Sequence, residues 1–154
     1  MKFVKLTAVA ATLAALSGCA TAPMQHDIEK THAFAEPKDV IWERAVNFFA
    51  ERNLSIKTIE KASGIIAADR TITAPTTGIE GFADCGKAPL MIPTSQTIDL
   101  NLFVRTLPNG NTTVTVNAQF TETRRFGQYP PVTVSCTSTG KIEQAILGSL
   151  GHEI

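Results

Sequence analysis

The first long apolar pattern after the N-terminal segment has the spacing of an amphipathic helix. In residues 39–52 the apolar positions are Ile41, Trp42, Ala45, Val46, Phe48 and Phe49. Pro37 and Asp39 favour a helix start at this point, and Asn53 favours a stop. We therefore predict a helix with one buried face. Its aromatic side chains are interpreted as core residues, with a ligand-binding stripe as the alternative.

A second helical stripe lies near the C-terminus, in residues 141–150. Its apolar members are Ile142, Ala145, Ile146 and Leu150. Ser138 or Thr139 is the expected N-cap, because a hydroxyl oxygen can accept a bond from a free helical N–H group. The sequence thus predicts a short terminal helix that also buries one face.

Between the helices, apolar and polar residues alternate with the period of strands. The clearest runs, residues 97–106 and 111–121, flank the turn sequence Pro108-Asn109-Gly110 and predict a hairpin. Further strands are predicted at 31–35, 54–58, 65–72 and, as a short strand or loop end, at 132–134. The stretches 73–95 and 122–131 lose the alternation and are predicted to be loops.

This order of elements predicts the α+β class. Strands with one apolar and one polar face form antiparallel sheets that are covered on one side, and each helix has one face to bury. We expect a two-layer sandwich in residues 31–154, with an antiparallel sheet of four to five strands and two helices on one face.

The N-terminus has the features of a secretory signal: Lys2 and Lys5, then the apolar run 6–16. The following Leu16-Ser17-Gly18-Cys19 resembles the lipobox of bacterial lipoproteins at every position. The resemblance implies a signal peptide in residues 1–18 and fatty acyl chains, such as palmitate, on Cys19. The protein would then be anchored to a membrane through these chains.

The segment 19–30 has no periodicity and is predicted to be a flexible tether. Ala20 occupies the position where Asp resembles an inner-membrane retention signal. Its presence therefore favours the outer membrane, with the domain facing the periplasm.

Two cysteines, Cys85 and Cys136, remain once Cys19 carries lipid. In an oxidising compartment such a pair predicts a disulfide bond. A metal-binding or catalytic thiol is the alternative, but His26, His32 and His152 are scattered and no C-x2-C spacing is present. We expect neither a metal nor a cofactor.

Charge and motifs narrow the function further. Fourteen basic and fourteen acidic residues cancel in the full chain, which argues against a nucleic-acid partner. The sequence lacks the common nucleophile, phosphate-loop and zinc motifs. Glu80 and Asp84 share the first long loop and form a candidate carboxylate pair, with two solvated surface acids as the alternative.

The second loop carries the most suggestive cluster: Arg124, Arg125, Phe126 and Tyr129. Guanidinium groups beside aromatic rings are suited to an anionic headgroup, a glycan carboxylate or an acidic protein patch. The alternative interpretation is a polar hairpin loop that its charges keep soluble.

Residues 34–64 resemble the helix-grip domains of the BamC-type lipoprotein of the β-barrel assembly machinery. The similarity lies in a strand end, a Pro-x-x-x-Ile-Trp helix start, Asn-Leu-Ser-Ile, and Ser-Gly-Ile-Ile after a turn. This chain would hold one such domain rather than two, and it adds the cysteine pair. The resemblance implies an accessory lipoprotein without enzymatic activity.

The leading hypothesis is therefore a lipid-anchored envelope lipoprotein with an interaction or structural role, whose partner is an envelope protein or polymer. A binding module for a small apolar ligand or lipid beside Trp42 is one alternative. An envelope hydrolase is the other.

Overall fold

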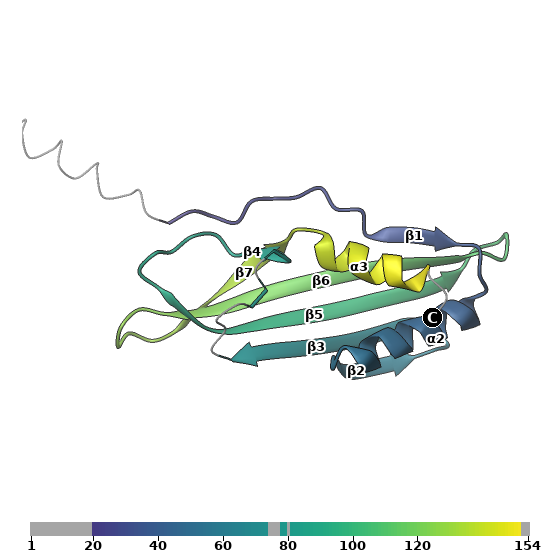
Figure 1. Cartoon of the computed structure of the whole chain (residues 1–154), viewed down its shortest axis with the longest axis horizontal. Helices are drawn as coiled ribbons and strands as arrows, with labels where there is room; N and C mark the ends of the chain where they lie inside the picture. The colour runs from purple at the N-terminus through teal and green to yellow at the C-terminus, as the bar shows by residue number, and fades with distance from the viewer. Residues whose placement is uncertain (1–19, 74–77, 80, 152–154) are drawn as a thin grey trace, which may run out of the picture.

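The computed structural model describes residues 20–73, 78–79 and 81–151, so Cys19, Glu80 and His152 lie outside the described residues. Within these ranges the chain forms seven strands and two helices (Figure 1). They are β1 (Thr31–Phe34), α2 (Lys38–Glu51), β2 (Ser55–Glu60), β3 (Ile65–Thr73), β4 (Ala83–Asp84), β5 (Ile92–Thr106), β6 (Thr112–Arg125), β7 (Val132–Ser138) and α3 (Lys141–Leu150).

All the described strand pairs are antiparallel, in the order β2-β3-β5-β6-β7-β4. β1 also pairs with β6, along Thr112–Thr115, whereas β7 pairs with Phe120–Arg124. β1 and β7 therefore share one edge of β6, because β5 occupies the other edge along its whole length.

The expected α+β class and antiparallel sheet are confirmed, but the expected four to five strands are too few for the described residues. The structure has seven. The two-residue β4 lies inside the stretch predicted to be a loop, and β7 is longer than the short strand expected there. β4 gains its pairing from the distant end of β7, which local alternation cannot reveal, whereas β7 forms a hairpin with the extended end of β6.

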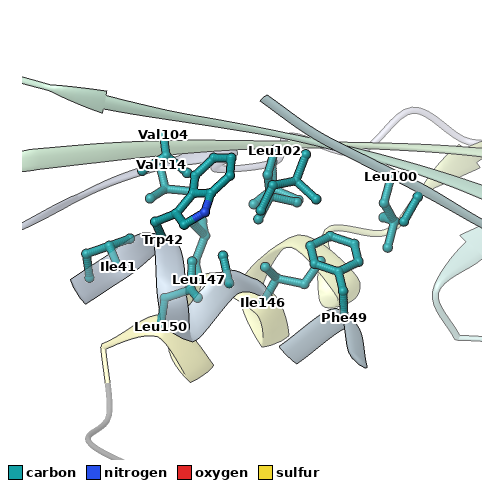
Figure 2. Packing of buried hydrophobic residues seen from close by; sticks show 14 of the residues in the cluster. Ile41, Trp42, Phe49, Leu100, Leu102, Val104, Val114, Ile146, Leu147 and Leu150 are labelled. Atoms are coloured by element: carbon teal, nitrogen blue, oxygen red, sulfur yellow. The ribbon is translucent and has the colours of Figure 1, made fainter. Parts of the chain in front are cut away.

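The helices α2 and α3 lie together on one face of the sheet, and the core fills the space between the two layers (Figures 1 and 2). Trp42 and Phe49 project from α2 toward the sheet and are at most 5% exposed. Leu102 and Val104 of β5 meet them and are fully buried. Each such side chain contributes about 1.5–3 kcal/mol by leaving water. Trp42 and Phe49 are thus core residues, as predicted, whereas Phe48 is only partly buried and packs against the core.

The start of α3 differs from the prediction that Ser138 or Thr139 caps the helix. The N-cap is Gly140, whose φ of 85° is left-handed. The Ser138 hydroxyl accepts a hydrogen bond from the Gly140 N–H at 3.1 Å and donates one to Oε2 of Glu143 at 2.8 Å. Glu143 is fully buried, and this hydroxyl satisfies only Oε2, because Oε1 has no hydrogen-bond partner among the described residues.

Candidate functional site

One end of the molecule carries a concentration of exposed apolar side chains. We define the hairpin end as residues Lys87–Ile92, which lead into β5, together with Arg125–Val132, which connect β6 to β7. Five of the ten large hydrophobic side chains that are exposed among the described residues belong to it: Leu90, Ile92, Phe126, Tyr129 and Val132. Leu90, Ile92 and Tyr129 are each about two-thirds exposed or more, at 73%, 69% and 68%.

The connection between β6 and β7 presents two stacked aromatic rings. The centroids of Phe126 and Tyr129 are 5.7 Å apart and their planes differ by 17°. The Tyr129 N–H donates to the carbonyl oxygen of Phe126 at 3.0 Å, which closes the turn. Arg125 is exposed beside this pair, opposite Ile92 of β5. These three predicted site residues therefore do lie together on the surface.

The fourth predicted residue, Arg124, does not belong to that surface. It is 8% exposed and lies within β6, because β6 extends to Arg125 where a loop was predicted from residue 122. Its Nε bonds to Oε1 of Glu122, and its Nη2 donates to the carbonyl oxygens of Cys85 at 2.7 Å and Gly86 at 3.1 Å. Arg124 thus attaches the loop that precedes β5 to the sheet.

Two further buried polar residues, which the sequence did not single out, complete this cluster. The Gln96 amide donates to Oε2 of Glu122, and its Oε1 accepts a bond from the Ile79 N–H at 3.0 Å. Gln96 and Glu122 are each 5% exposed. A groove of about 370 Å³ opens over the cluster, between the loop and the sheet. Because its polar groups bond to loop backbone, we interpret the cluster as structural.

A disulfide bond joins Cys85 to Cys136, with an S–S distance of 2.02 Å, as predicted. It links the loop to β7, close to the short pairing of β4 with the end of β7. The loop that leads to the hairpin end is therefore held by a covalent bond, by Arg124 and by backbone pairing.

The N-terminal segment of the described chain is attached to the same loop. Thr21 and Lys87 exchange two backbone hydrogen bonds, of 3.0 and 3.1 Å, in an antiparallel bridge. Gly86 permits this approach, because its φ is +68° and a Cβ atom there would lie 2.1 Å from the Thr21 carbonyl oxygen. Within the segment 19–30, predicted to be a flexible tether, Thr21 and Met24 thus have backbone groups bonded to the domain.

Asp84 holds this attachment through its carboxylate. Its Oδ2 accepts the Met24 N–H at 2.9 Å and its Oδ1 accepts the Gly86 N–H at 2.8 Å. These bonds, that from Met24 first, lower the pKa of Asp84 below its ordinary value. Its proposed partner Glu80 lies outside the described residues, so no carboxylate pair is placed.

The other candidate regions are surface grooves. One of about 390 Å³ runs past Trp42, with Val46 and Ile59 among its lining residues. Another, of about 480 Å³, lies between β1 and α3 and includes His32 and Glu36. Among the described residues no group of three His, Cys, Asp or Glu side chains is arranged to hold a metal ion.

Neither a scan against protein-family models nor a search of curated proteins finds a match to this chain. In the part of the chain that the structure describes, neither helix has the length and apolar character needed to cross a membrane.

Proposed function

We propose that this chain is a lipid-anchored lipoprotein of the bacterial outer membrane, facing the periplasm, with an interaction or structural role rather than an enzymatic one. The motif Leu16-Ser17-Gly18-Cys19 supports the anchor. The observation that carries the proposal is the position of Thr21, two residues beyond Cys19, on the loop of the hairpin end. An acylated Cys19 would therefore be held close to the exposed apolar surface.

The residues at this end are suited to binding rather than to chemistry. Phe126 and Tyr129 offer a rigid apolar contact, and Arg125 adds a planar cation. Asp84, the nearby acid, is already engaged by two backbone N–H groups. The envelope component that binds here would therefore be recognised through apolar and anionic groups.

Mass spectrometry of the protein purified from bacterial membranes tests the anchor. We expect the N-terminal tryptic peptide to span Cys19 to Lys30 and to carry acyl chains, and Cys19→Ser to abolish the modification. Recovery of an intact Met1 with an unmodified Cys19 would overturn the proposal. Fractionation of Ala20→Asp, expected to shift the protein toward the inner membrane in an enterobacterial host, tests the sorting.

A photo-reactive amino acid placed at Tyr129 tests the interaction surface in cells. We expect cross-links to an envelope component from this position and few from Ala62, an exposed turn residue between β2 and β3. Equal cross-linking from both positions would remove the hairpin end as the binding surface.

A further inference from the structure

We propose that the hairpin end docks directly on the surface of the bilayer that holds the acyl anchor. This inference rests on the proposed lipidation of Cys19 and names the partner of the same surface. The occupant is the lipid surface itself, and a protein partner at this end is an alternative that the experiment below distinguishes.

The first argument is the short reach between the anchor and the domain. Thr21 is bridged to Lys87, and only Ala20 separates it from Cys19. Two residues of extended chain span at most about 7 Å. A lipidated Cys19 would therefore hold the Lys87 region within one or two side-chain lengths of the lipid headgroups.

The second argument is that this region is firmly attached to the aromatic turn. The bridged loop is joined to β7 by the Cys85–Cys136 disulfide and to β6 by Arg124. The Lys87–Ile92 segment then leads straight into β5, where Ile92 stands opposite Arg125. A membrane that holds Cys19 would consequently be held near a loop whose position relative to the aromatic turn is fixed.

The third argument is the chemistry of the surface. The sequences Lys87–Ile92 and Arg125–Val132 contain two cations, Lys87 and Arg125, and no acidic residue. Exposed aromatic and aliphatic side chains next to basic residues are typical of surfaces that sit at the headgroup boundary. The cations would complement anionic headgroups.

The arrangement of these side chains also indicates how the molecule stands on the membrane. Ile92 lies opposite Arg125 and Val132 lies opposite Arg124. Because consecutive residues of a strand point to opposite faces, Ile92 and Val132 lie on opposite faces of the sheet. The apolar surface therefore surrounds the tip, which suits end-on contact with the long strands directed away from the bilayer.

Because the link between the acyl chains and the domain is short, a surface of low lipid affinity is sufficient for docking. A domain joined to its membrane by two residues experiences an effective lipid concentration far above that of a free protein. Contact by a few side chains would then keep the hairpin end bound for most of the time, without deep insertion.

Fluorescence quenching by brominated lipids tests the proposal on the acylated full chain. The protein is purified from membranes and reconstituted into vesicles of phosphatidylcholine and phosphatidylglycerol that carry bromine on the acyl chains. Tyr129→Trp places a reporter at the tip, and Ala62→Trp is the matched control beyond the opposite end of β3. Trp42, which is 5% exposed in the core, gives a constant background and a check of folding.

We expect the added emission of Tyr129→Trp to shift to shorter wavelength and to be mostly lost in brominated vesicles, while that of Ala62→Trp is unchanged. Adding Leu90→Asp to Tyr129→Trp is expected to restore much of the emission, because the new charge resists leaving water.

Equal emission of Tyr129→Trp with and without bromine, in protein whose Cys19 carries acyl chains, would overturn the docking and leave the proposed function intact. Cross-linking of Tyr129 to a protein together with such unquenched emission would assign the surface to that protein. An unmodified Cys19 in the purified protein would instead remove the proposed function, and this inference with it.

Discussion

Arg124 and Arg125 are sequence neighbours, yet their side chains have opposite environments. One guanidinium bonds to Glu122 and to two loop carbonyl groups, and the other faces solvent. The cause is the alternation of a strand, in which even-numbered positions of β6 continue the inward face past Phe120. A pair of arginines in a sequence therefore does not establish a basic surface.

Arg124→Met is expected to destabilise the fold by about 3–5 kcal/mol, because it leaves the buried Glu122 carboxylate without its cation. The side chains of Arg124 and Glu122 are 9% and 7% exposed, so water does not replace the lost bond. Urea unfolding of the oxidised protein measures the effect. Arg125→Met is the matched control, and its change should stay within about 0.5 kcal/mol. Equal effects of the two variants would contradict a buried ion pair.

Two glycines with a left-handed backbone conformation allow the cost of backbone strain to be separated from the cost of a steric clash. Gly64 has a φ of +73°, and a Cβ atom there would lie 2.0 Å from the Val104 carbonyl oxygen. Gly110 has a φ of +85° and open space around it. Gly110→Ala should cost about 1–2 kcal/mol from backbone strain alone. Gly64→Ala should cost clearly more, as judged by thermal unfolding, and similar melting temperatures would contradict the close approach of the β2–β3 turn to β5.

At the scale of elements, β5 and β6 are longer than their alternation predicts. Gln96, Glu122 and Arg124 occupy inward positions where apolar residues are expected, so the hydrophobic pattern stops before the strands do. These polar side chains are buried because the loop before β5 covers them and supplies their hydrogen-bond partners. That cover depends on the tertiary structure and leaves no periodic signal.

The contact between the N-terminal segment and the loop should depend on pH through Asp84. The folded-state pKa of Asp84 is lowered, so its ionised form stabilises the contact above the unfolded-state pKa, which is about 3.9. This stabilisation declines as the pH falls through that value and is lost below the folded-state pKa. We expect the Met24 amide resonance to move on acidification below about pH 4, as followed by NMR.

Asp84→Asn is the control for this titration, because it removes the ionisable group and should abolish the acid-dependent movement of the Met24 resonance. A local probe is required here, since Glu36 and Asp39 also have lowered pKa values and affect global stability in the same direction. An unchanged titration in the variant would assign the effect to another group.

At the scale of the whole molecule, the disulfide closes a long loop. Its cysteines are 51 positions apart, and β5 and β6 lie between them. Chain entropy predicts a contribution of up to about 4 kcal/mol for a loop of this length. The double variant Cys85→Ser, Cys136→Ser should therefore unfold at lower urea concentration. Its hydrogen exchange should increase first in residues 81–91, where the loop depends on the bridge, and uniform exchange would contradict this anchoring role.

The sequence alone determined the two helices, the central hairpin and the cysteine pairing. The predicted 39–52 and 141–150 correspond to α2 and α3, because each helix carries its own apolar period and local turn signals. The cysteine pair followed from counting once Cys19 was assigned to lipid. Phe126 and Tyr129, which the sequence predicted to belong to a possible interaction surface, are exposed in the structure.

Only the tertiary structure decided which side chains form the exposed end. It moved Arg124 into the interior, brought Ile92 opposite Arg125, and placed the N-terminal segment on the loop that precedes β5. These side-chain environments depend on contacts between residues far apart in the sequence, and short-range periodicity does not predict such contacts. The proposed lipid anchor is the opposite case, since its prediction rests on the four-residue motif Leu16-Ser17-Gly18-Cys19 and on no tertiary contact.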